Sequence, residues 1–112
     1  MKQFQNNAGD ILGKMKDIKE FFDVTLVSDD GEKIMVHKVV LASASSLFRE
    51  IFQDSEEDKD YQEISMKGVH SKYVNAMVEL IYNGETKIKM IECEEFLNIL
   101  KQYRVASKEY VR

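Results

Sequence analysis

The strongest constraint on the fold is a change of hydrophobic period within residues 23–52. Apolar side chains recur at every second position over residues 23–28 and again over residues 32–37, which is the period of a half-buried β-strand. From Lys38 onward this alternation stops and apolar residues cluster. The stretch therefore predicts two strands joined by a tight turn and followed by two short helices.

The turn and the strand faces can be assigned residue by residue. Residues 29–31 read Asp-Asp-Gly, and both residue types tolerate the positive φ that hairpin turns require. Val24 and Leu26 share one face of the first strand, and Ile34 and Val36 point inward from the second. The pair is therefore expected to bury one face.

Two short helices are expected after the second strand. Residues 38–45 are nearly all apolar, so this helix must be buried or partnered. Either Ser45 or Ser46 caps the next helix through its hydroxyl. The apolar stripe of that helix consists of Leu47, Phe48, Ile51 and Phe52.

An amphipathic helix is predicted ahead of this stretch, over about residues 8–20, after a frayed segment at residues 1–7. Its glycines, Gly9 and Gly13, weaken it by roughly 1 kcal/mol each relative to Ala. Such a helix forms mainly if its apolar face packs on something, either its own domain or another chain. That face comprises Ile11, Met15, Ile18 and Phe22, with Leu12 beside them.

Further short elements are expected after an acidic loop. They are a strand over residues 63–67, a helix over residues 72–83, an extended segment over residues 86–89 and a helix over residues 92–105. Ile64 and Met66 point inward from the strand. Ser71 is expected to cap the first of these helices and Gly84 to end it. The charged tail then extends or frays.

Composition narrows the possible functions. The net charge of −4 argues against a nucleic-acid-binding surface, which needs clustered Lys and Arg. No apolar run approaches the roughly 18 residues of a membrane span, and the polar N-terminus does not resemble a secretory signal. A single cysteine, Cys93, excludes an internal disulfide, so an intracellular, reducing compartment is the simplest interpretation.

The sequence contains no recognisable catalytic or metal-binding pattern. The two histidines, His37 and His70, share no ligand spacing with a cysteine or carboxylate pattern. We expect His37 to be a structural histidine, hydrogen-bonded where strand meets helix. The serines near it lack a Gly-x-Ser-x-Gly elbow, and no glycine-rich phosphate loop is present. The sequence therefore predicts no enzyme, no cofactor and no metal.

Several of these segments, in this order, resemble the BTB/POZ domain. The resemblance lies in Phe-x-Asp-Val-Thr-Leu at residues 21–26, the hairpin, and His-Lys-Val-Val-Leu-Ala-Ser at residues 37–43. Residues 77–84 and 96–105 are similar to later helices of that family. The resemblance implies an α+β fold: a small, mostly three-stranded sheet flanked by a cluster of helices, with an N-terminal dimerisation helix.

The resemblance also implies an organisation and an interface. Residues 1–20 would be an extension with the dimerisation helix, residues 21–105 the BTB/POZ core, and residues 106–112 a tail. In such domains the N-terminal helix and the short helix after the hairpin pack against a second chain. The implied dimer interface is Ile11, Leu12, Met15, Ile18, Phe22, Val39, Val40 and Leu41.

Asp23 and Lys38 match an acid and a base that form a charged pocket at the dimer interface of several BTB domains. A half-buried charge needs a partner, because desolvation otherwise costs several kcal/mol. Under this interpretation the pair fixes the geometry of the dimer. The alternative is that Asp23 caps backbone amides while Lys38 reaches solvent.

The acidic loop at residues 53–63 bears on a second function. BTB adaptors of cullin-type ubiquitin ligases often carry here a hydrophobic anchor, then any residue, then Glu. The cullin-contact loop implied by the resemblance comprises Phe52, Glu56, Glu57 and Asp58. Glu56 stands at the anchor position, where a charge loses the burial and adds a desolvation cost. This departure weakens the adaptor interpretation and leaves it open.

The resemblance is greatest to BTB domains of transcription and chromatin regulators, including the arthropod tramtrack group. The expected function is self-association into dimers or higher oligomers, with co-regulator peptides or a cullin as further partners, and neither nucleic acid nor membrane bound directly. A nuclear location follows from this, with the cytoplasm as the alternative. A cullin-type ubiquitin ligase adaptor is the alternative function.

Overall fold

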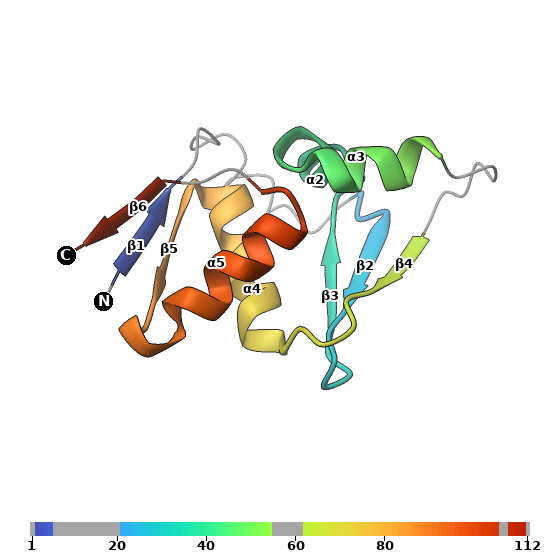
Figure 1. Ribbon diagram of the computed structural model, residues 1–112. Helices are drawn as coiled ribbons and strands as arrows, with labels where there is room; N and C mark the ends of the chain where they lie inside the picture. The colour runs from blue at the N-terminus through green and yellow to red at the C-terminus, as the bar shows by residue number, and fades with distance from the viewer. Residues whose placement is uncertain (1, 6–20, 55–61, 106–107, 112) are drawn as a thin grey trace.

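The computed structural model describes residues 2–5, 21–54, 62–105 and 108–111. Within them, two three-stranded sheets lie at opposite ends of the molecule, and helices lie between and above them (Figure 1). The predicted α+β fold, with its small three-stranded sheet and its helices, is confirmed. A second sheet, which the sequence did not indicate, accompanies it.

The first sheet, called the hairpin sheet below, has β2 (Val24–Val27) at its centre. This strand pairs antiparallel with β3 (Lys33–Val36) and parallel with β4 (Gln62–Ser65). The predicted turn is present, and Gly31 within it adopts φ 87°. This left-handed conformation is strained for residues with a side chain and is readily adopted by glycine. The third strand ends earlier than predicted, yet Met66 just beyond it is fully buried in the common core.

Two helices follow β3 as predicted, α2 (Lys38–Ala44) and α3 (Ser46–Gln53), and they lie above the hairpin sheet in Figure 1. Ser45 between them is the cap of α3, because its Oγ accepts a hydrogen bond from the N–H of Phe48 at 3.2 Å. The same Oγ donates to the carbonyl of Tyr103 at 2.5 Å. One hydroxyl thereby joins the start of α3 to Tyr103, which follows the last helix of the chain.

The central helix is α4 (Ser71–Asn83), and Gly84 ends it in the left-handed conformation as predicted. The prediction that Ser71 caps this helix is wrong by one residue. His70 is the cap, with its Nδ1 accepting the N–H of Lys72 at 3.1 Å. The apolar residues buried along α4 are Tyr73, Val74, Ala76, Met77, Val78, Leu80, Ile81 and Tyr82.

The hydroxyl of Ser71 does not cap α4 and instead bonds Asp30 in the hairpin turn, which packs against this end of the helix. The Asp30 carboxylate accepts hydrogen bonds from the backbone N–H of Ser71 at 2.8 Å and from its hydroxyl at 2.7 Å. These bonds, that of the hydroxyl above all, hold the pKa of Asp30 well below its usual range. The hairpin turn therefore supplies the hydrogen-bond acceptor for a backbone N–H in the first turn of α4.

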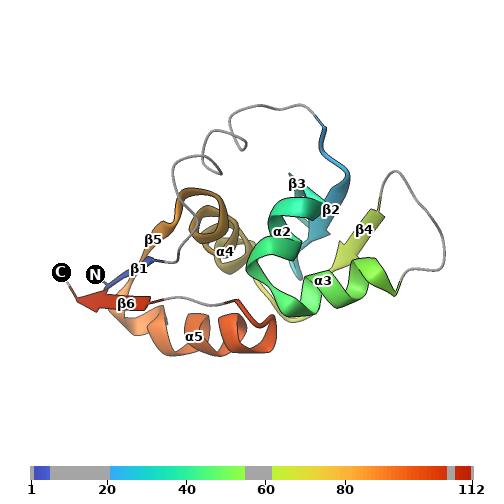
Figure 2. The ribbon, with the colours of Figure 1, turned by 90° about the horizontal axis from the view of Figure 1, so that it is seen from above.

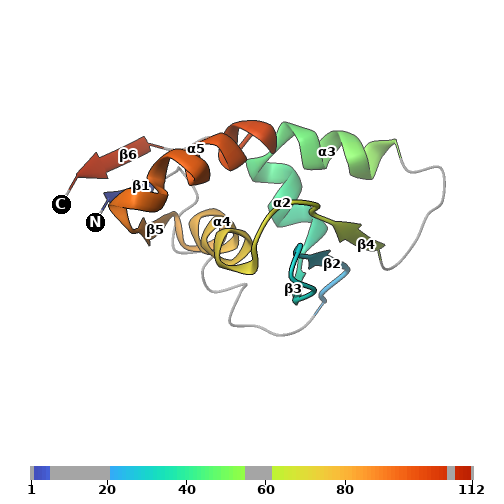
Figure 3. The same cartoon turned by 60° about the horizontal axis from the view of Figure 1, so that its bottom comes forward.

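The last helix begins after a 3-10 turn, η1 (Met90–Glu92), and runs as α5 (Cys93–Gln102), in a row with α3 in Figure 3. The prediction that it continues to residue 105 is wrong. Arg104 adopts φ 53°, and the N–H of Val105 donates to the carbonyl of Leu100 at 2.8 Å. This is the pattern of a Schellman motif, with an arginine where glycine is usual.

The second sheet, called the terminal sheet below, places β1 (Lys2–Gln5) between β5 (Glu85–Ile88) and β6 (Lys108–Val111), antiparallel to both (Figure 2). The expectation of a frayed N-terminus is thus wrong for this strand. Phe4 is fully buried, and its ring meets that of Phe96 edge-on with centroids 5.0 Å apart. The charged tail takes the extended form through β6.

Candidate interaction surface

The junction between β3 and α2 gathers the residues of the predicted charged pocket. The Asp23 carboxylate accepts a hydrogen bond from the backbone N–H of Lys38 at 2.7 Å, so it satisfies an N–H in the first turn of α2. The Lys38 side chain is half-buried, with its Nζ 5.9 Å from the centroid of the Phe52 ring. Within one chain, Asp23 therefore bonds a backbone N–H at the start of α2, and the charged pocket at a dimer interface stays a prediction.

His37 lies beneath this junction and is buried. Its backbone N–H donates to the Tyr82 hydroxyl oxygen at 2.8 Å, and its Nδ1 lies 2.7 Å from the same oxygen. Burial raises the pKa of Tyr82 to about 12, and the nearby charge of Asp23 acts in the same direction. The expectation of a hydrogen-bonded histidine where strand meets helix is confirmed.

Exposed apolar side chains surround the same junction. Phe21 is 84% exposed and Val39 is 68% exposed, while Phe22 is half-buried with its ring 4.7 Å from that of His37. We call Phe21, Phe22 and Val39 the α2 patch. A hydrogen bond of 3.2 Å between the N–H of Asp23 and the Val36 carbonyl holds the segment carrying the two phenylalanines against β3.

The other predicted interface residues fall into two groups. Val40 and Leu41 are 1% and 0% exposed, so they belong to the core of this chain and offer no surface to another. The remaining four, which are Ile11, Leu12, Met15 and Ile18, lie outside the described residues together with the rest of the predicted N-terminal helix. Phe21 was not among the predicted interface residues, although it is exposed and adjoins the predicted residue Phe22.

The predicted cullin-contact loop is described only at its first residue. Phe52 is half-buried on α3 and stacks on Phe48 with centroids 6.1 Å apart. Glu56, Glu57 and Asp58 lie outside the described residues. The described part of this segment therefore shows an aromatic side chain that is anchored mainly within its own chain.

Among the described residues, no three His, Cys, Asp or Glu side chains gather closely enough to hold a metal ion. Cys93 is buried, and its Sγ lies 3.4 Å from the Lys89 carbonyl. None of the helices in the described ranges has both the length and the apolar character to cross a membrane. The described chemistry is thus that of packing surfaces and structural hydrogen bonds.

A family model for the BTB/POZ domain matches residues 12–109. The chain belongs to the BTB/POZ family, whose domains are protein-interaction modules. The BTB domain of human gigaxonin superposes with a TM-score of 0.73 at 22% identity, covering 87% of this chain and 80% of that one. The BTB domain of zebrafish PATZ1 gives a TM-score of 0.70 at 21% identity, covering 86% and 76%.

Curated relatives carry this domain within longer proteins. Kelch-like protein 9 of Mus musculus is 35% identical over 85 residues, which is 70% of this chain and 14% of that protein. The Broad-complex core protein of Drosophila melanogaster is 29% identical over 103 residues, 92% of this chain and 14% of that protein. Bric-a-brac 2 of the same organism is 31% identical over 97 residues, which is 87% of this chain and 8% of that protein.

Proposed function

We propose that this domain brings together two copies of the protein that carries it, through the α2 patch and the predicted helix at residues 8–20. The observation that carries the proposal is the exposure of Phe21 and Val39 beside a half-buried Lys38. Burying an apolar side chain of this size contributes about 1.5–3 kcal/mol before entropic costs. In a symmetric dimer the patch would be buried twice.

The protein is proposed to be a regulator of transcription or chromatin located in the nucleus. Similarity to the Broad-complex core protein and to bric-a-brac 2, two members of the tramtrack group, supports this assignment. Pairing two copies would join two weak binding sites into one avid site through their effective concentration. Assembly beyond the dimer, in multiples of the dimer mass, belongs to the same proposal.

A substrate adaptor of a cullin-type ubiquitin ligase is the second candidate. The similarity to Kelch-like protein 9 supports it, and the charge at Glu56 argues against it. A direct test is a pull-down with a purified N-terminal cullin domain. Retention of this domain on the cullin at micromolar concentration would favour the adaptor, and an absence of retention would favour the regulator.

Light scattering over a hundredfold range of concentration tests self-association. The expected mass is about 26 kDa, twice the 13.0 kDa of one chain, or a multiple of it. Val39→Asp should raise the dissociation constant of the dimer at least about tenfold, because a charge would replace two methyl groups that the proposed dimer buries. Ile91→Asp is the matched control, since Ile91 is 91% exposed and lies on η1, outside the α2 patch.

Two results would count against the proposal. The first is a constant mass of 13.0 kDa for the unaltered chain at every concentration. The second is equal weakening by Val39→Asp and Ile91→Asp, which would show a general effect of added charge. The double variant Ile11→Asp with Met15→Asp extends the test to the predicted helix, where a folded dimer would exclude that helix from the interface.

A further inference from the structure

A groove of about 290 Å³ runs between α4 and β5, away from the α2 patch. One wall is a stripe on α4 at helical spacing, formed by Lys72, Asn75, Ala76 and Glu79. The other wall is β5, which contributes Thr86, Lys87 and Ile88. Gly84 ends α4, and β5 begins at the next residue, so the two walls diverge from one turn and the groove follows the strand. In Figures 1 and 2, β5 lies between β1 and α4.

The strand that forms this wall has an unpaired edge in the described structure. Within the described ranges β5 is the outer strand of its sheet and pairs with β1 alone. An edge strand presents a row of backbone N–H and C=O groups that another extended chain can pair with. Extended peptides bind proteins by adding a strand to such an exposed sheet edge.

Positive charge gathers along the groove. Lys72 forms an ion pair of 2.6 Å with Glu92, which lines one end. The hydrogen bond and the charge of Lys72 lower the pKa of Glu92, and the charge of Lys89, which is exposed, acts in the same direction. Lys87 is exposed with no side-chain partner among the described residues, and Glu79 is the remaining acid of the lining, so three lysines face two acids. The uncompensated charge of the groove is thus positive on a chain whose net charge is −4.

Two exposed apolar residues follow β5 in the chain, next to the lining residues Lys89 and Glu92 but outside the lining itself. Lys89 leads into η1, where Met90 is 56% exposed and Ile91 is 91% exposed. Large apolar side chains this exposed and adjacent are a common feature of protein interaction sites. A ligand that lay along β5 would reach this pair at one of its ends.

We propose that the α4–β5 groove binds an extended acidic peptide segment of another protein. The peptide would add as a strand to the outer edge of β5, with carboxylates beside Lys87 and Lys89 and an apolar side chain over Met90 and Ile91. The small side chain of Ala76 leaves room for it on the helix side. This site is separate from the α2 patch and does not depend on self-association.

The test uses the full chain and a panel of fluorescein-labelled decapeptides that alternate Glu with Val or Thr and carry Leu, Ile or Phe at one end. Fluorescence anisotropy should show saturable binding that weakens with added salt. Lys87→Glu with Lys89→Glu should weaken it about tenfold. The matched control, Lys67→Glu with Lys101→Glu, changes two exposed lysines outside the lining and should stay within about twofold.

A second readout distinguishes strand addition from simple charge attraction. Binding should slow the hydrogen exchange of β5 backbone amides. Filling the groove with Asn75→Phe, at an exposed position of the lining, should weaken binding while the circular dichroism spectrum is kept. Three results would overturn the proposal: no saturable binding by any peptide of the panel, equal binding of peptides with Lys in place of Glu, or tighter binding of a single-stranded DNA oligonucleotide of the same charge.

Discussion

The hairpin sheet and the terminal sheet are both built from three four-residue strands, but the chain assembles them differently. In the hairpin sheet, β2 and β3 are joined by a tight turn around Gly31, and the alternating pattern of each strand is legible by itself. The terminal sheet joins residues 2–5 and 108–111 across nearly the whole sequence. Strands that pair across a short turn can be predicted from the sequence around that turn. Strands from the two ends of the chain pair without any sequence pattern that connects them.

The largest effect that distinguishes the two sheets should come from Phe4→Ala. Phe4 is fully buried against Phe96, so losing its ring removes apolar burial and leaves a cavity worth about 3–5 kcal/mol of unfolding free energy. Urea unfolding followed by circular dichroism measures it. Ile91→Ala, at a position 91% exposed, is the control and should change stability by less than about 0.5 kcal/mol. Equal effects would mean that β1 adds nothing to the core.

The comparison also explains what the sequence predicted and what it did not. The hairpin, α4 and its glycine end follow from period and turn chemistry, because each is decided by residues a few positions apart. β1 contains a single apolar residue, Phe4, so it has no alternating pattern that could predict a strand. Similarly, the place where α5 ends depends on Arg104 adopting a conformation that glycine usually supplies, and the sequence carries no glycine there.

The residues of the candidate surface also fall into those that nearby sequence predicts and those that depend on distant packing. Asp23, Lys38 and Val39 could be proposed from the sequence because they adjoin the hairpin or belong to the helix after it. The sequence could not distinguish the buried Val40 and Leu41 from the exposed Val39, because in a short, nearly all-apolar helix the buried side is set by packing against α3 and α4. The groove beside β5 was missed because its walls are assembled by the fold rather than by a motif.

The next effect concerns the contact that joins the hairpin region to α4. Tyr82→Phe removes the hydroxyl that meets the N–H and the Nδ1 of buried His37, and the loss should cost about 1–3 kcal/mol. Tyr103→Phe is the matched control, because no described side chain or backbone group is bonded to its hydroxyl. The control should cost less than about 0.5 kcal/mol by urea unfolding. A cost for Tyr82→Phe no larger than that of the control would show that this bond contributes little.

The same tyrosine predicts a loss of stability in alkali. Its pKa is raised to about 12 in the folded chain from an ordinary value of 10.0, so the unfolded chain releases its proton first. The unfolding free energy should therefore be fully present below pH 10 and fall as the pH rises toward 12. Tyr82→Phe should lack this part of the decline. An identical alkaline profile for the two proteins would contradict the assignment.

A smaller effect is expected at the link between α3 and the end of α5. Ser45→Ala removes both the cap bond to the Phe48 N–H and the bond to the Tyr103 carbonyl, and it should cost about 1–2 kcal/mol. Ser43→Ala is the control, because the Ser43 hydroxyl bonds only within its own helix, to the carbonyl of Val40. It should change stability by less than about 0.5 kcal/mol. Similar costs for the two would argue that the link is dispensable.

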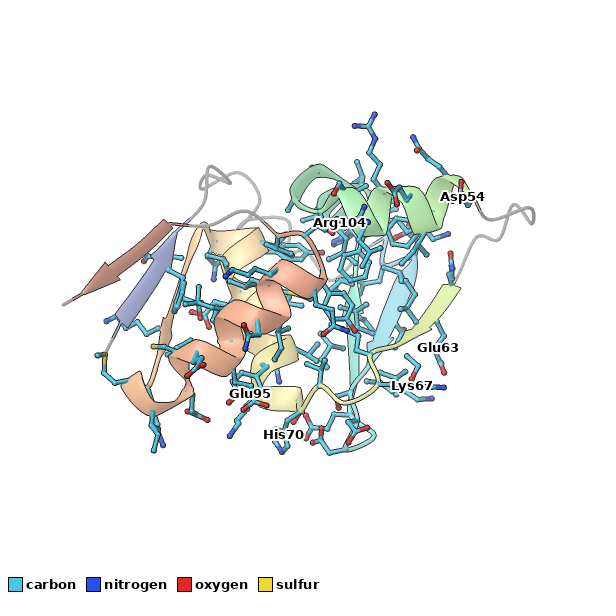
Figure 4. All side chains as sticks on the ribbon, viewed as in Figure 1. Asp54, Glu63, Lys67, His70, Glu95 and Arg104 are labelled. Atoms are coloured by element: carbon cyan, nitrogen blue, oxygen red, sulfur yellow. The ribbon has the colours of Figure 1, made fainter. Side chains whose placement is uncertain are left out.

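The smallest effect should sharpen the comparison at the point where α5 turns toward the terminal sheet. Arg104 adopts φ 53° and forms an exposed ion pair with Glu50 at 3.2 Å, so it faces α3 in Figure 4. Arg104→Gly relieves the strain but loses the ion pair, worth about 0.2–1 kcal/mol, so the net change should be close to zero. Arg104→Ala loses the ion pair and keeps the strain. The glycine variant should therefore be the more stable of the two by about 1 kcal/mol in urea unfolding, and equal stabilities would mean that this helix end carries no strain.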